Sequence, residues 1–98
     1  MRPFDFHPEA RAEYLASIAY YGDASIGLGT AFANEVEDAI ALILSYPSAW
    51  PALGGAVRRC MLGRFPCGII YTERDNGILI LAVAHAKRAP GYWRSRQK

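Results

Sequence analysis

A chain of 98 residues, of which 52% are hydrophobic and 12% aromatic, has apolar material for one compact core and no room for a second domain. We therefore expect one domain over residues 1–98. No apolar run approaches the ~20 residues that cross a bilayer, and the first residues lack the pattern of a secretion signal. The sequence thus predicts a cytoplasmic protein with no membrane contact.

Cysteine and histidine usage predicts no metal site, no disulfide and no cofactor. The chain has no C-x-x-C pair, and His7 and His85 lie far apart in the sequence. In a cytoplasmic chain, Cys60 and Cys67 are best interpreted as small residues of the core.

The net charge of +2 conceals an uneven distribution of charged residues. Residues 1–55 hold two basic and seven acidic residues, whereas residues 56–98 hold nine basic and two acidic ones. A basic half of this kind is typical of a protein that meets an acidic partner, either nucleic acid or an acidic peptide. The alternative is that the helices and the strands simply carry different charged residues on their solvent-exposed faces.

The first half of the chain predicts a short strand and two helices. Aromatic and acidic residues alternate over residues 3–6, as in a strand. Pro8 suits the first turn of a helix over residues 8–22, and a second helix starts between residues 25 and 30 and must end before Pro47. The apolar positions at helical spacing are Ala10, Tyr14, Ile18 and Tyr21 in the first helix and Phe32, Val36, Ile40, Ile43 and Leu44 in the second.

The second half predicts three antiparallel strands in sequence. After a loop over residues 47–55, in which Trp50 plugs the edge of the core, the strands are expected over residues 56–62, 67–72 and 78–85. Asn76-Gly77 favours a tight hairpin turn between the last two. The basic, aromatic tail is either a short helix or mobile. Together these elements predict an α+β fold, a helical hairpin packed on a small, mostly antiparallel four-stranded sheet in the order β-α-α-β-β-β.

The strand over residues 78–85 is central to this prediction. Its uninterrupted apolar residues indicate a strand covered on both faces, which places it in the interior of the sheet. His85, Lys87 and Arg88 follow where the strand leaves the sheet, and a rigid scaffold commonly presents its functional groups at such a position.

In this order, the elements and four stretches of sequence resemble toxins of the RelE/ParE superfamily, the growth-arresting halves of bacterial type II toxin-antitoxin pairs. The stretches are the helical stripe that ends in Tyr46-Pro47, residues 57–62, residues 65–71 and residues 82–93. The last is most similar to the ParE-like branch, often called plasmid stabilisation proteins. The resemblance covers nearly the whole chain and implies a single RelE/ParE-like toxin domain.

The resemblance implies a different target in each branch. ParE-like toxins poison DNA gyrase by a protein contact and need no catalytic centre, whereas RelE-like toxins cleave mRNA on the ribosome. Our first interpretation is gyrase poisoning with neutralisation by a cognate antitoxin, and DNA is reached only through that antitoxin. The alternatives are a ribosome-dependent mRNA endonuclease and an inactive module that only binds the antitoxin. The sequence favours a protein that is not an enzyme; if it is one, it is an mRNA endoribonuclease.

Two sets of site residues follow from these interpretations. RNA cleavage needs a proton acceptor, a proton donor and cations for the phosphate, for which the candidates are Arg59, Arg64, His85 and Tyr92. The residues expected to bind the target are Arg58, Arg64, His85, Lys87, Arg88, Tyr92 and Trp93.

Simpler structural roles compete with these. By strict alternation His85 shares a strand face with Leu79, Leu81 and Val83, and it would then donate to a backbone carbonyl. Tyr92 and Trp93 either stack on bases or pack over the core.

Overall fold

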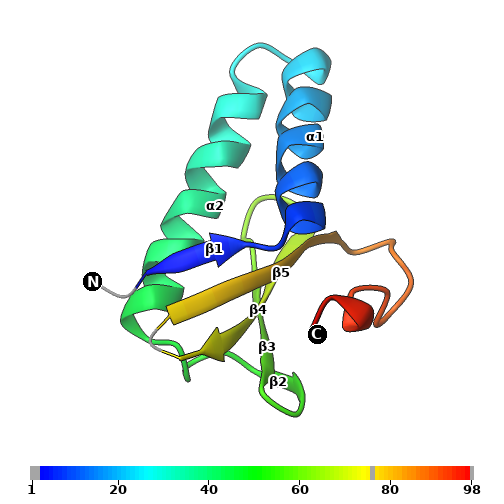
Figure 1. Ribbon diagram of the computed structural model, residues 1–98. Helices are drawn as coiled ribbons and strands as arrows, with labels where there is room; N and C mark the ends of the chain where they lie inside the picture. Colours follow the sequence, from blue (N-terminus) through cyan, green and yellow to red (C-terminus); the bar gives the residue numbers. More distant parts are fainter. Residues whose placement is uncertain (1–2, 76, 98) are drawn as a thin grey trace.

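The computed structural model describes residues 3–75 and 77–97 and confirms two helices packed on one sheet (Figure 1). In chain order the elements are β1 (Phe4–Phe6), α1 (Pro8–Ala24), α2 (Leu28–Ser45), β2 (Ala52–Gly54), β3 (Val57–Met61), β4 (Cys67–Arg74), β5 (Gly77–His85) and a 3-10 helix (Arg94–Gln97). The predicted α+β class is therefore correct. None of the described helices combines the length and the hydropathy that a membrane-spanning helix requires.

Local chemistry sets the ends of both long helices. His7 precedes α1 and its Nδ1 accepts the Glu9 N–H at 3.1 Å, while Pro8 takes the first turn, where a missing N–H costs no hydrogen bond. α2 begins after Gly27, whose φ of 81° lies in the left-handed region that glycine adopts without strain. It ends ahead of Pro47, as predicted.

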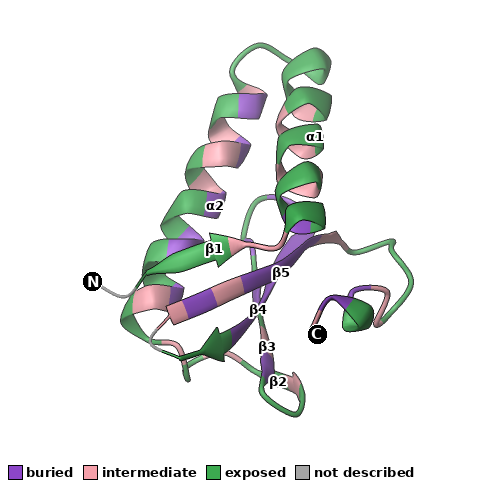
Figure 2. Cartoon of the chain, in the orientation of Figure 1, coloured by how far each residue is buried: buried purple, intermediate pink, exposed green. Residues whose placement is uncertain are grey.

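The predicted apolar stripes of the helices form the core between the helices and the sheet (Figure 2). Tyr14, Ile18 and Tyr21 of α1 pack against this core, and Trp50 covers its edge as expected. The fully or nearly buried residues of α2 are Phe32, Val36, Ala39, Ile40 and Ile43. The two cysteines are free and buried among them, and burial raises the pKa of both thiols. Their predicted role as core residues is confirmed.

The strand order in the sheet is β1-β5-β4-β3-β2. β1 runs parallel to β5, and the other neighbours are antiparallel, so residues 57–85 form the predicted meander. β5 lies between β1 and β4, which confirms its interior position.

The sheet has five strands, so the prediction of four strands was wrong. The strand that the prediction missed is β2. This strand lies in the stretch that we expected to be a loop. It pairs with β3, and the N–H of Arg59 donates to the carbonyl of Pro51 at 3.1 Å. Three residues that include a glycine are too few to show the alternation that identifies a strand in a sequence.

A bulge in β5 changes the faces of the residues that follow it. Ile70 lies opposite Ala82 and Tyr71 lies opposite Ile80, so Leu81 is an extra residue on β5. Leu81 and Ala82 consequently both belong to the cluster on the side of the sheet away from the helices.

The bulge also corrects the predicted face of His85. His85 lies opposite Cys67, which belongs to the helix-side core, as does Val83. The expectation that His85 shares a face with Leu79, Leu81 and Val83 is right for Val83 and wrong for the two leucines, because strict alternation does not anticipate an extra residue.

The hairpin turn between β4 and β5 joins Arg74 to Gly77, which lie opposite each other. Asp75 carries the positive φ, 49°, at the first of the two turn positions. The prediction for Asn76 lies outside the described residues.

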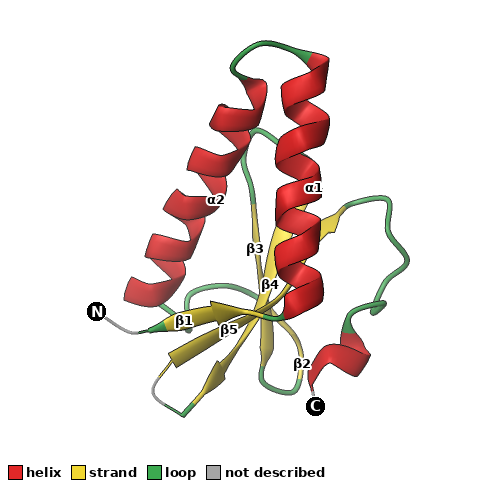
Figure 3. Cartoon of the chain, turned by 45° about the horizontal axis from the view of Figure 1, so that its top comes forward, coloured by secondary structure: helices red, strands yellow, loops and turns green. Residues whose placement is uncertain are grey.

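The face of the sheet that the helices do not cover, the open face, has a smaller core of its own. The residues after β5, here called the C-terminal segment (residues 86–97), fold back beside β2 and bring Trp93, 3% exposed, onto this face (Figure 3). The tail alternatives are thus decided: the described part of the tail ends in a short helix, and its tryptophan packs over the core.

The two glycines at the helical hairpin allow a sharp test of this packing. A Cβ on Gly29 would lie 2.7 Å from the carbonyl oxygen of Ile18, a backbone atom that cannot move cheaply. We expect Gly29→Ala to lower the free energy of unfolding by about 1–3 kcal/mol through overpacking. Chemical denaturation followed by circular dichroism measures this change.

The matched control is Gly22→Ala, because a Cβ on Gly22 meets no atom within 4 Å. This change should be neutral or stabilising by up to about 1 kcal/mol, because alanine favours the helix more than glycine does. Equal effects of the two substitutions would contradict the close helix contact.

Candidate partner-binding site

The carboxylate of Glu13 on α1 is the point at which the C-terminal segment is attached to the rest of the fold. Its two oxygens accept from the Arg96 guanidinium, with both N–O distances at 3.0 Å, and from the Tyr92 hydroxyl at 2.8 Å. Arg88 lies 3.8 Å from the same carboxylate. A planar guanidinium that meets a carboxylate with two hydrogen bonds is the strongest of these contacts.

The Glu13–Arg96 pair is almost removed from solvent, with side-chain exposures of 15% and 7%. Burial alone lowers the pKa of the Arg96 guanidinium, but the hydrogen bonds and the charge of Glu13 outweigh it, so the pKa is raised. The Arg96 guanidinium therefore stays charged at neutral pH. Glu9 adds a weaker contact to Arg96 at 3.7 Å, from a side chain that is 67% exposed.

The same ion pair also covers the part of β5 that β1 does not reach. The last backbone contact on the β1 side is the N–H of His7 with the carbonyl of Ile80, at 2.8 Å. Beyond it, the Arg96 guanidinium donates to the carbonyl of Leu81 and the N–H of Val83 donates to Glu13, both at 3.0 Å. These side chains satisfy backbone groups that would otherwise invite pairing with another strand.

Guanidinium groups already lie over both aromatic rings of the C-terminal segment. Arg88 lies 3.9 Å and Arg96 5.0 Å from the centre of the Tyr92 ring, and Arg94 lies 4.7 Å from that of Trp93. Burial, together with the hydrogen bond to Glu13, raises the pKa of Tyr92 to about 12. Tyr92 is therefore a bound hydrogen-bond donor.

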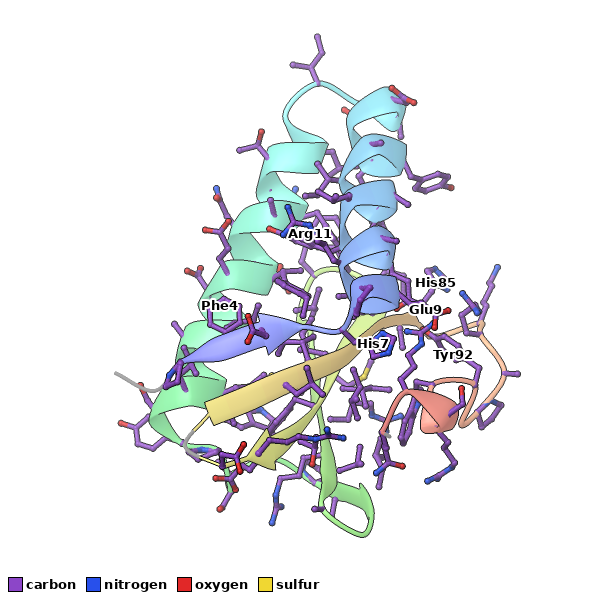
Figure 4. All side chains as sticks on the ribbon, viewed as in Figure 1. Phe4, His7, Glu9, Arg11, His85 and Tyr92 are labelled. Atoms are coloured by element: carbon purple, nitrogen blue, oxygen red, sulfur yellow. The ribbon has the colours of Figure 1, made fainter. Side chains whose placement is uncertain are left out.

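A pocket of about 360 Å³ brings five of the eight predicted site residues together. It lies between the open face of the sheet and the C-terminal segment. Its lining includes Arg59, His85, Arg88, Tyr92 and Trp93. Figure 4 shows His85 and Tyr92 on the same side of the molecule, where β5 leaves the sheet.

The other three predicted residues, Arg58, Arg64 and Lys87, lie outside this lining. Arg58 is half-buried and donates to the carbonyl of Trp50 at 2.7 Å, which fixes the loop before β2. Arg64 and Lys87 are exposed. Both lie near the end of β5, because the N–H of Ala86, just after β5, donates to the carbonyl of Pro66, in the turn that holds Arg64, at 2.8 Å.

His85 is half-buried, and its Nδ1 accepts the N–H of Lys87 at 3.1 Å. This is the reverse of the expected donation to a carbonyl, but it is equally local and structural. Because Nδ1 is an acceptor here, the ring proton of neutral His85 lies on Nε2.

Four residues of this region were missed by the sequence analysis: Glu13, Gly68, Arg94 and Arg96. Glu13 and Arg96 are 83 positions apart, and no local pattern links such a pair. An acidic residue on an otherwise apolar turn of α1 was the one available signal. The described residues hold no cluster of three or more metal-binding side chains.

Comparison with known proteins identifies the family. The family described as ParE toxin of type II toxin-antitoxin system, parDE, matches residues 4–90. The chain belongs to the ParE toxin family. A solved structure titled "Chromosomal ParDE TA system from P. aeruginosa" superposes on this ParE-family toxin with a TM-score of 0.73 and 17% identity, covering 89% of this chain and 98% of the other. A search of the curated proteins found no match.

The ParE-family toxin should depend strongly on the Glu13 carboxylate. Glu13→Gln leaves Arg96 charged and buried with only the weaker contact to Glu9 at 3.7 Å, and we expect the free energy of unfolding to fall by about 3 kcal/mol. The control, Glu9→Gln, alters an exposed contact and should cost less than about 0.5 kcal/mol. Urea denaturation of both variants measures the difference, and a similar small loss for both would contradict the attachment role of Glu13.

The raised pKa of Tyr92 predicts a loss of stability in alkali. The folded pKa of about 12 exceeds the ordinary 10.0, so the folded state holds this proton more tightly than the unfolded state does. The stabilisation is complete below pH 10 and is lost as the pH rises towards 12. The substitution Tyr92→Phe should remove one tyrosine that ionises near pH 12, and spectrophotometric titration measures this loss. Removal of one that ionises near 10 would contradict the bond to Glu13.

Proposed function

We propose that this chain arrests bacterial growth by poisoning DNA gyrase through a protein contact in the cytoplasm, and that a cognate antitoxin neutralises it. Membership of the ParE toxin family supports the toxin role. The solved chain that it superposes on comes from a complex titled as a ParDE toxin-antitoxin system, which supports an antitoxin partner.

The state of Tyr92 carries the non-catalytic part of the proposal. With a pKa of about 12, Tyr92 stays protonated at neutral pH and is therefore not available as a base. Its hydroxyl hydrogen is already used in the hydrogen bond to Glu13. Trp93 is buried and offers no free face to a base. Of the cleavage candidates, Arg64 lies outside the pocket that holds Arg59, His85 and Tyr92. These observations weigh against ribosome-dependent mRNA cleavage.

We assign the gyrase contact to the exposed cations where β5 leaves the sheet, chiefly Arg64, Lys87 and Arg88, with His85 beside them. Arg88 is 53% exposed, and the other two are also exposed. Of the remaining predicted residues, Arg58 is held by its contact with Trp50 and Trp93 is buried, so these two support the surface from within.

The test is to induce the chain alone in bacteria. We expect growth arrest with filamentation and a DNA-damage response, and purified protein should trap gyrase on DNA in a cleavage assay. The double charge reversal Arg64→Glu with Lys87→Glu should abolish arrest, because like charges then face the target. The control, Arg11→Glu on α1, also reverses an exposed arginine and should arrest growth as the wild type does.

Three other results would contradict the proposal. Mapped cuts in translated messages that disappear with His85→Ala would identify the mRNA endonuclease. Harmless expression of folded wild-type protein would identify a module that only binds the antitoxin. Full arrest by the double variant would leave gyrase poisoning in place but remove the assigned surface.

A further inference from the structure

Three arginines line the pocket on the open face. Arg59 comes from β3, while Arg88 and Arg94 come from the C-terminal segment. Met61, Ile70 and Ala84 of the sheet give it an apolar floor, and the C-terminal segment adds further apolar residues. The described lining residues include no aspartate or glutamate. The pocket therefore combines a positive rim with an apolar floor.

Gly68 on β4 makes room for this floor. A Cβ on Gly68 would lie 2.9 Å from the sulfur of Met61 and 3.1 Å from the side-chain carbons of Arg59. The side chains of β3 therefore lie across β4 at a position where any other residue would displace them. The glycine lets Arg59 extend along the sheet beside the pocket.

The rim arginines differ in how far their charge is compensated. Arg88 lies 3.8 Å from Glu13, and Arg94 stacks on Trp93 and donates to the carbonyl of Leu53 at 3.5 Å. Within residues 3–75 and 77–97, Arg59 makes no ion pair and is exposed. Two of the three guanidinium groups thus lack a carboxylate partner among these residues.

Nucleic acid fits this pocket less well than peptide. Single-stranded nucleic acids gain much of their affinity by stacking bases on aromatic rings. Here two guanidinium groups already lie over the ring of Tyr92, and Trp93 is 3% exposed. Aliphatic side chains, by contrast, match a floor of methionine, isoleucine and alanine.

We propose that this pocket binds an acidic and aliphatic peptide segment of the antitoxin, with a carboxylate held between Arg59 and Arg94 and apolar side chains on the floor. The inference rests on the proposed function, because it assumes that the antitoxin is the partner. Two arginines that close on one carboxylate make charge-assisted hydrogen bonds, and apolar neighbours strengthen these bonds by excluding water. Arg64 and Lys87 of the proposed gyrase contact lie outside this pocket, whereas Arg88 and His85 line it and belong to both surfaces.

The test uses full-length toxin and the antitoxin protein encoded beside it. Arg59→Glu and Arg94→Glu should each weaken antitoxin binding about tenfold or more, because one charge of a close pair is reversed. Arg11→Glu is the matched control and should bind within about twofold of the wild type. Wild-type affinity should also fall as ionic strength rises. Isothermal titration calorimetry gives all four dissociation constants.

Gly68→Ala provides a second variant without a change of charge. It should weaken binding by displacing Met61 and Arg59, while circular dichroism shows whether the fold is kept. Unchanged antitoxin affinity in all three pocket variants would overturn the inference.

A growth assay separates this inference from the proposed function. Pocket variants that still arrest growth, but that the antitoxin no longer rescues, would support it. Variants that lose arrest yet keep antitoxin binding would overturn it and assign the pocket to the target. Tighter binding of a labelled RNA oligonucleotide to the wild type than to Arg59→Glu, with antitoxin binding equal, would overturn it in favour of nucleic acid. Wild-type protein that neither arrests growth nor binds the antitoxin would instead defeat the proposed function itself.

Discussion

The ion pair between Glu13 and Arg96 joins α1 to the second half of β5 and to the C-terminal segment, both of which are far from α1 in the sequence. A buried pair gives little net stability over an apolar replacement, but either partner without the other is costly. The ion pair therefore mainly selects one position of the C-terminal segment over others. Other positions of the segment would leave a buried charge uncompensated, so this arrangement is favoured over them. One wall of the open-face pocket follows from it, because the lining residues 88–94 lie within the chain that connects β5 to Arg96.

Two irregularities of the sheet make this attachment possible. β1 has only three residues, so it pairs with β5 as far as Ile80 and leaves the rest of that edge uncovered. The bulge at Leu81 then changes the alternation of β5. The carbonyl of Leu81 accepts a hydrogen bond from Arg96, and the N–H of Val83 donates one to Glu13. A longer first strand would occupy these groups and exclude the ion pair. A sheet edge that would otherwise invite strand addition is satisfied by side chains instead.

The sequence predicted what depends on local periodicity and missed what depends on distant contacts. Helical stripes such as Phe32 to Ile43 and the apolar run of β5 repeat at the spacing of their elements, and both were placed correctly. β2 was missed because its pairing partner, not its own three residues, defines it. The bulge shifted His85 to the other face, since an extra residue leaves no mark in an alternating pattern. Of the site, the position of His85, Lys87 and Arg88 after β5 was predictable, whereas the bonds that Glu13 makes to the tail were not.

The basic half of the chain is divided between internal and external roles, and this division bears on how a partner approaches. Arg58 and Arg96 are used inside the molecule, one on the carbonyl of Trp50 and one on Glu13. The arginines that remain around the open face, Arg59, Arg88 and Arg94, face no carboxylate from the pocket lining. The acidic residues of α2 lie on the opposite side of the sheet, with the helices. Long-range attraction therefore orients an acidic partner towards the open face and away from the helical layer, before any specific contact forms. These basic residues thus act less as one uniform patch than as two internal anchors, Arg58 and Arg96, and a surface on the open face.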